Sequence, residues 1–117
     1  MSDWFGGSEE GQLSVDVFRE GDELIIRSLA AGILPEQLDI HLHEDVLTIR
    51  GRREPERVVP DEQWFYRECY WGTFSRSIVL PVNVSSERAI AQLKNGVVEI
   101  RLPIEEQGRK VKVTWQT

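Results

Sequence analysis

The amino-acid sequence predicts an all-β protein, an immunoglobulin-like antiparallel β-sandwich of about eight or nine strands. Three observations lead to this fold class. Apolar and polar residues alternate with a period of two along most of the chain, as on strands with one buried face. Turn signals built from Gly, Pro, Asn and Asp separate the alternating runs. No stretch of useful length shows the helical spacing of three and four. The 117 residues fit one domain with a modest core.

The first half of the chain predicts four strands. In order, they cover residues 13–18, 24–29, 38–42 and 46–51. The break after the second strand holds Pro35-Glu36-Gln37, which fits one helical turn. The third strand has the clearest half-buried pattern, and the turn at Glu44-Asp45 leads directly into the fourth. These two strands are therefore predicted to form a β-hairpin.

The second half predicts four more strands after a long loop. Residues 52–62 are charged and non-periodic and contain Pro55 and Pro60, which indicates an exposed loop. The strands that follow cover residues 63–70, 73–80, 89–93 and 98–102. The first of them is rich in aromatic residues. Asn95-Gly96 is the strongest hairpin signal in the chain, because both central positions of a type I′ turn require positive φ.

Composition and charge disfavour several classes of function. Lys and Arg total 14 and Asp and Glu total 20, a net charge of −6, which disfavours binding to nucleic-acid phosphates. No apolar run approaches the roughly 20 residues that span a bilayer, so we expect no membrane partner. Residues 1–10 show neither a basic nor an apolar signal region, and the single cysteine, Cys69, has no internal disulfide partner. We therefore expect a reduced, cytoplasmic setting.

The residue inventory predicts a protein that is not an enzyme and holds no cofactor. Phosphate-binding glycine motifs and the metal-binding H-E-x-x-H pattern do not occur. His41 and His43 share one strand face, but the chain has no other histidine and no second cysteine, so the three or four ligands of a metal site are not at hand in the sequence pattern. The two histidines are expected to face solvent.

Several segments, in order and at matching spacing, resemble the small heat-shock protein family. Residues 72–81, GTFSRSIVLP, resemble its pattern G-x-F-x-R-x-[hydrophobic]-x-L-P, and residues 91–98, AQLKNGVV, resemble A-x-x-x-N-G-V-L. Leu102-Pro103 closes the domain as in the family, and residues 111–113 are similar to its C-terminal I/V-x-I/V motif. The resemblance implies a short N-terminal arm (1–12), an α-crystallin domain (13–103) with a protruding loop and dimerisation strand (52–72), and a C-terminal extension (104–117).

The resemblance also implies a strand-swapped homodimer. The aromatic strand would cross to a partner and pair with the partner's first strand. Arg76 shares a face with Ile78 and Leu80, so its guanidinium needs an acceptor, and the resemblance implies a structural arginine at or near the dimer interface. The implied interface residues are Trp64, Phe65, Tyr66, Arg76, Val15 and Val17. The residues alone also allow an ordinary strand of the chain's own sheet and a solvated Arg76.

A second implied surface is an apolar groove between the two sheets. Its candidate residues are Leu38, Ile40, Leu42, Ala91 and Leu93. In the family such a groove receives the C-terminal motif, here Val111 and Val113, which project from one face of an extended chain. The alternative is a closed core, with residues 111–115 as the last strand of the sandwich.

The function implied is that of an ATP-independent molecular chaperone that binds unfolding proteins and suppresses their aggregation. Its partners would be unfolded clients, a second copy of itself, higher oligomers built from the dimer, and ATP-driven chaperones that act downstream. Two other classes stay open. A co-chaperone-type CS domain, which binds one folded partner, would lack the crossing strand and be monomeric. A small sandwich that binds carbohydrate or another ligand would have a defined pocket.

Overall fold

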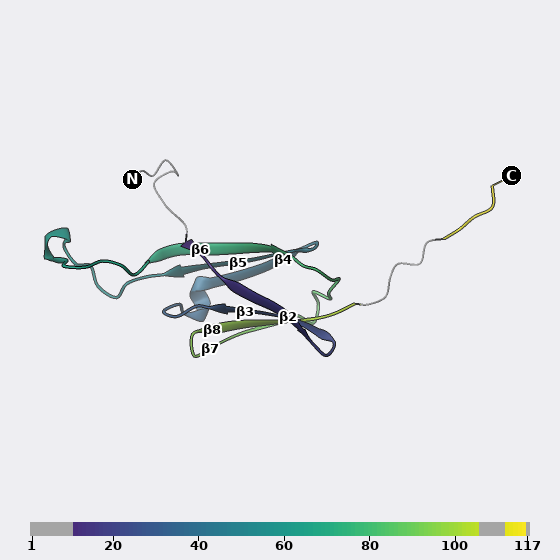
Figure 1. Ribbon diagram of the computed structural model, residues 1–117, viewed down its shortest axis with the longest axis horizontal. Helices are drawn as coiled ribbons and strands as arrows, with labels where there is room; N and C mark the ends of the chain where they lie inside the picture. The colour runs from purple at the N-terminus through teal and green to yellow at the C-terminus, as the bar shows by residue number, and fades with distance from the viewer. Residues whose placement is uncertain (1–10, 106–111, 117) are drawn as a thin grey trace.

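Two four-stranded sheets pack face to face, as the alternating pattern predicts (Figure 1). The computed structural model describes residues 11–105 and 112–116. The first sheet has the order β1-β6-β5-β4, with bounds Gly11–Gln12, Gly72–Val79, Val46–Arg53 and Leu38–His43. The second has the order β2-β3-β8-β7, with bounds Val15–Glu20, Glu23–Leu29, Val97–Pro103 and Ile90–Lys94. Neighbouring strands are antiparallel except β1, which runs parallel to β6.

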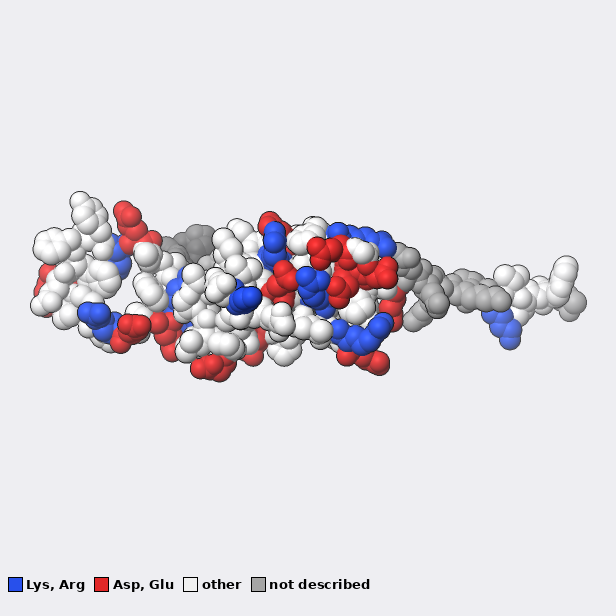
Figure 2. All heavy atoms as spheres, turned by 90° about the horizontal axis from the view of Figure 1, so that it is seen from below, with Lys and Arg blue, Asp and Glu red and all other residues white. Residues whose placement is uncertain are grey.

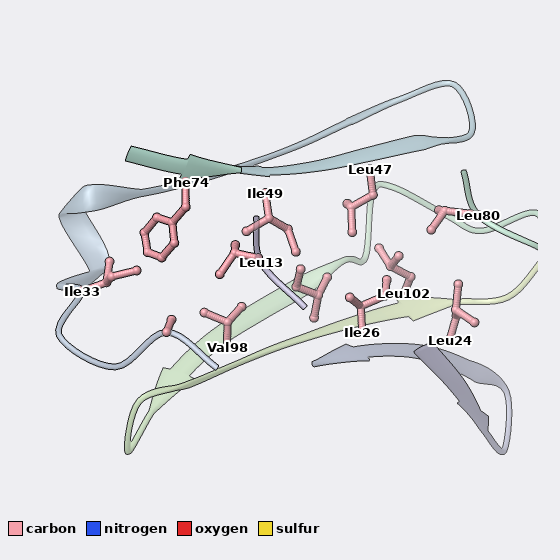
Figure 3. Close-up of a cluster of buried hydrophobic side chains, with 12 residues drawn as sticks. Leu13, Leu24, Ile26, Ile33, Leu47, Ile49, Phe74, Leu80, Val98 and Leu102 are labelled. Atoms are coloured by element: carbon pink, nitrogen blue, oxygen red, sulfur yellow. The ribbon is translucent and has the colours of Figure 1, made fainter. Parts of the chain in front are cut away.

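The core lies between the inner faces of the two sheets. Figure 3 shows side chains of the first sheet (Leu47, Ile49, Phe74) meeting side chains of the second (Leu24, Ile26, Val98, Leu102). Ile49 and Ile26 are completely buried. Each such side chain contributes about 1.5–3 kcal/mol through removal of its apolar surface from water. This packing holds the two sheets in one arrangement and so fixes where their edges lie.

The turns predicted at Asn95-Gly96 and at Pro35–Gln37 are both present in the structure. Asn95 and Gly96 have φ of 54° and 78°, the two positive values that the tight turn between β7 and β8 requires. Residues Pro35–Gln37 (η1) form one turn of 3-10 helix, as predicted. The alternation in β4 is also confirmed, because Leu38, Ile40 and Leu42 are half-buried while the residues between them are exposed.

The predicted strand at residues 63–70 is absent from the sheets of this chain. Apart from the 3-10 turn Asp61–Gln63 (η2), residues 54–71 form an irregular arm that projects beyond the ends of β5 and β6 (Figure 1). A strand exists only where a neighbouring strand takes its backbone hydrogen bonds, and the arm extends away from both sheets. The expectation of an ordinary strand in the chain's own sheet is therefore wrong.

The first predicted strand, residues 13–18, is matched by β2 only from Val15 onward, and a separate short strand precedes it. Gly11–Gln12 pairs with β6 in the first sheet, and β2 begins only at Val15 in the second sheet. Leu13, buried between them, marks the crossing from one sheet to the other. The period of two places Leu13, Val15 and Val17 on one face of a strand, but Leu13 is buried, Val15 is half-buried and Val17 is 37% exposed. The crossing breaks the simple alternation because Leu13 and Val17 belong to different parts of the fold.

The outer face of the second sheet carries a network of charges. Arg101 pairs with Glu23 at 2.8 Å, with Glu99 at 2.9 Å and with Glu20 at 3.3 Å. The hydrogen bond with Glu23 is the main cause that raises the pKa of Arg101 above its usual value. Basic and acidic side chains lie interspersed on the face seen in Figure 2. That face therefore lacks the single-sign basic stripe that a phosphate backbone would require.

Candidate functional site

An apolar groove lies where an edge strand of one sheet approaches an edge strand of the other. β4 ends the first sheet and β7 ends the second. Between them is a cavity of about 300 Å³, lined on one side by Ile40 and Leu42 and on the other by Ile90 and Ala91. Its lining also includes the core residues Leu47, Ile100 and Leu102. Edge strands have no neighbour on one side, so their inward side chains stay half-covered and can contact a further segment.

Three of the five predicted groove residues line this cavity. They are Ile40, Leu42 and Ala91. Leu38 and Leu93 do not line it, and both are half-buried against the core cluster. None of the five is fully buried, so they do not form the closed core that was the alternative expectation.

Sequence reasoning missed Ile90 as a groove residue. Ile90 is the first residue of β7 and is 53% exposed. Its position alternates with Ala91, and the period of two alone assigns it to the outer face. At the edge of a sheet such a side chain can still reach the rim of a groove. The available signal was a large apolar residue at a position predicted to face solvent.

The C-terminal segment leaves large apolar side chains in solvent. Val113 is 89% exposed, and residues 112–116 are not part of a strand. The alternative expectation, that residues 111–115 form the last strand of the sandwich, is therefore wrong for residues 112–115. Val111, the other half of the predicted docking motif, lies outside the described residues. Trp115, which the prediction overlooked, is 96% exposed and alternates with Val113.

The arm presents aromatic side chains that the chain itself does not bury. Phe65 is 95% exposed and Tyr66 is 83% exposed. Trp64 is held within the arm, because its Nε1 donates a hydrogen bond to the Val59 carbonyl at 3.2 Å and its ring lies 4.2 Å from the Arg67 guanidinium. The arm is therefore braced internally while its two most exposed aromatic rings remain uncovered.

The predicted counterpart of the arm, β2, is an open edge. β2 pairs with β3, and among the described residues no other strand pairs with it. Val15 is half-buried and Val17 is partly exposed along this edge. An edge of this kind offers free backbone donors and acceptors to an added strand. Its pairing with a second chain stays a prediction.

Arg76 finds its acceptor inside its own chain. Its Nη1 donates a hydrogen bond to the Leu13 carbonyl at 3.0 Å, and the side chain is half-buried. The contact ties β6 to the crossing between β1 and β2. The need for an acceptor was predicted correctly, whereas the place of Arg76 at a partner interface stays a prediction.

The remaining polar candidates do not assemble into a site. His41 and His43 are exposed on β4, and Cys69 is an exposed free thiol on the arm. Within residues 11–105 and 112–116, no three His, Cys, Asp or Glu side chains are grouped so that they could hold a metal ion. No helix in the same part of the chain is long and apolar enough to cross a membrane.

Comparisons with known proteins agree with this architecture. The model of the Hsp20/alpha crystallin family matches residues 16–114. The chain is 32% identical over 98 residues to small heat shock protein C4 of Rickettsia felis. The aligned region covers 84% of this chain but only 60% of that protein. For small heat shock protein C2 of the same organism the identity is 35% over 82 residues, covering 70% of this chain and 53% of that protein.

Among solved structures, heat shock protein 16.0 from Schizosaccharomyces pombe superimposes with a TM-score of 0.75 at 26% identity. That alignment covers 92% of this chain and all of the solved chain. The similarity therefore includes both sheets of the sandwich.

Proposed function

Because the chain belongs to the Hsp20/alpha crystallin family, we propose that it is a molecular chaperone that binds unfolding proteins without ATP and suppresses their aggregation. The observation that supports this most directly is the apolar groove between β4 and β7, which stands open to further segments. In keeping with this role, we propose that the protein acts in the cytoplasm and that ATP-driven chaperones refold its clients.

The physical basis of the activity is competition for apolar surface. An unfolding client exposes apolar segments, and each Å² removed from water stabilises a contact by about 25 cal/mol. A segment that lies in the groove contacts Ile40 and Leu42 instead of another client molecule. Binding a non-native state shifts its equilibrium by mass action and requires no nucleotide. The net charge of −6 opposes association of the loaded complexes.

We propose a homodimer as the working unit. The arm of one chain would lie along the open edge of β2 in the other, with Phe65 and Tyr66 buried on the partner and Arg76 near the contact. This arrangement would satisfy the free backbone edge of β2 and cover two aromatic side chains that are more than four-fifths exposed in one chain. A twofold dimer makes the contact twice.

Higher oligomers would form through the C-terminal tail. In this proposal Val111 and Val113 enter the groove of a neighbouring dimer, so that tail and client compete for one site. The exposure of Val113 supports a role in contact with another surface. Valine offers less apolar area than isoleucine, so each contact should be weak and exchangeable.

The experiment that tests the function is light scattering of a heat-labile client at near-equimolar chaperone, in the absence of nucleotide. The unmodified protein is expected to suppress scattering, and Leu42→Asp to lose most of that protection, because the charge would lie in the groove. His43→Asp is the matched control, since its side chain is exposed one residue further along β4. No suppression by the unmodified protein would contradict the proposal and favour an adaptor that binds one folded partner.

A further inference from the structure

The arm joins the sandwich beside one arginine that contacts three separate segments. Arg53 is the last residue of β5. Its Nε donates a hydrogen bond to the Ala31 carbonyl at 2.6 Å, and its Nη1 donates to the Tyr70 carbonyl at 3.1 Å. Its guanidinium carbon lies 4.7 Å from the centre of the buried Phe74 ring. One side chain therefore joins the returning end of the arm to the loop after β3 and to the core.

The surroundings of Arg53 leave room for this contact. Gly32 has φ of 82°, and a Cβ at that position would lie 3.3 Å from the Arg53 side chain. A larger residue there would be strained by its backbone and would press on the guanidinium. The loop itself is anchored, because the Ala30 amide donates to the Gly96 carbonyl at 2.6 Å. Arg53 thus binds the arm to a fixed part of the second sheet.

Tyr70 provides a second attachment at the same place. Its hydroxyl donates a hydrogen bond to the Thr73 carbonyl. A Cβ on Gly11 would lie 3.1 Å from the Tyr70 ring, and a Cβ on Gly72 would lie 3.1 Å from its hydroxyl oxygen. The ring therefore lies close against β1 and the start of β6. The carbonyl that Arg53 holds thus belongs to a residue whose side chain is already packed.

Arg52, the neighbouring residue, makes contacts of a different kind. Its Nε pairs with Glu54 at 2.9 Å and its Nη1 donates to Thr73 at 3.3 Å, and both ion-pair partners are more than half exposed. Exposed pairs of this kind contribute little to stability, because water screens the charges. Arg52 carries the same charge and is adjacent in the chain, but within the described part of the structure its side chain bonds to Glu54 and Thr73 and not to the Ala31 loop or Tyr70. It is therefore the matched control.

We propose that Arg53 is a positioning residue that fixes the orientation of the arm on the sandwich and so presets it for the partner chain. This inference rests on the proposed function, in which the arm forms the dimer. An arm held in its bound orientation loses less conformational freedom on association, and the dimer is tighter by that amount. Phe65 and Tyr66 would make the contact, and Arg53 would act through the backbone of the arm.

The test measures arm mobility and dimer affinity in Arg53→Lys and Arg53→Ala, with Arg52→Ala as the control. Lysine keeps the charge and a long stem, but it cannot donate along both directions of the guanidinium plane. Hydrogen exchange of residues 54–71 is expected to quicken about tenfold or more in both Arg53 variants, while exchange in β3 and β8 stays unchanged. Sedimentation is expected to give a dimer dissociation constant raised about tenfold or more.

The outcomes distinguish the role of Arg53 in holding the arm from the formation of the dimer. Exchange in the arm that is equal in the unmodified protein and in Arg53→Lys would overturn the role of Arg53. Equal weakening of the dimer by Arg52→Ala would also overturn it, because charge alone would then explain the effect. If the unmodified protein is monomeric at every concentration while the arm still loosens in the Arg53 variants, the proposed dimer fails and the holding of the arm by Arg53 stands.

Discussion

Substitution of Phe65 by serine separates association from folding more cleanly than any other change on the arm. The side chain is 95% exposed in one chain, so Phe65→Ser should leave the free energy of unfolding of the monomer within about 0.5 kcal/mol of its original value. In the proposed dimer the same ring is buried. An aromatic side chain covers roughly 150–250 Å², which sets an upper limit of about 4–6 kcal/mol.

The expected effect on association is smaller than this limit and still large. Truncation of an aromatic anchor in an interface costs about 2 kcal/mol or more, since part of the burial energy offsets the ordering of the arm. A twofold dimer contains the contact twice, which gives about 4 kcal/mol. At 1.4 kcal/mol per factor of ten, the dimer dissociation constant should rise by roughly a thousandfold.

Sedimentation equilibrium over a broad concentration range measures the dissociation constant, and chemical denaturation at low concentration measures the stability of the monomer. Val79→Ser is the matched control, because Val79 is a 68% exposed apolar residue of β6 that lies away from the arm. A change of less than tenfold in the dissociation constant of Phe65→Ser would refute the reasoning, since the ring would then remain in solvent in the dimer.

Three further changes address the tail, the core and the crossing between sheets. Val113→Asp should reduce higher oligomers to dimers in size-exclusion chromatography with light scattering, whereas Thr114→Asp should not, and equal masses would contradict docking of the tail. Ile49→Ala should lower the unfolding free energy by about 2–5 kcal/mol in denaturant titration, because the side chain is completely buried; a loss under 1 kcal/mol would contradict this core packing. Arg76→Met should cost about 1–3 kcal/mol in thermal unfolding through the unpaired Leu13 carbonyl, and an unchanged melting temperature would show that water replaces the guanidinium.

The aromatic segment of the arm shows a limit of predicting strands from the local pattern of residues. Its composition predicted a strand, and the chain holds the segment as an irregular arm instead. Strand formation depends on a neighbour that takes the backbone hydrogen bonds, and that neighbour is not specified by the residues of the strand itself. The exposure of Phe65 and Tyr66 became visible only once both sheets were in place.

The sequence by itself determined the features that depend on near neighbours along the chain. The period of two in β4 and β8, the positive φ values at Asn95-Gly96 and the 3-10 turn at Pro35–Gln37 follow from side-chain alternation and turn chemistry. The order and spacing of its motifs also indicated the family.

Only the tertiary structure decided which distant edges meet. Leu42 and Ala91 stand 49 positions apart in the sequence and line one groove because β4 and β7 end different sheets. The same packing made Ile90 part of the groove, left Leu38 and Leu93 out of its lining, and brought the Ala31 and Tyr70 carbonyls to Arg53. Burial between two sheets is a property of the whole fold, and no period along the chain encodes which residues lie at its rim.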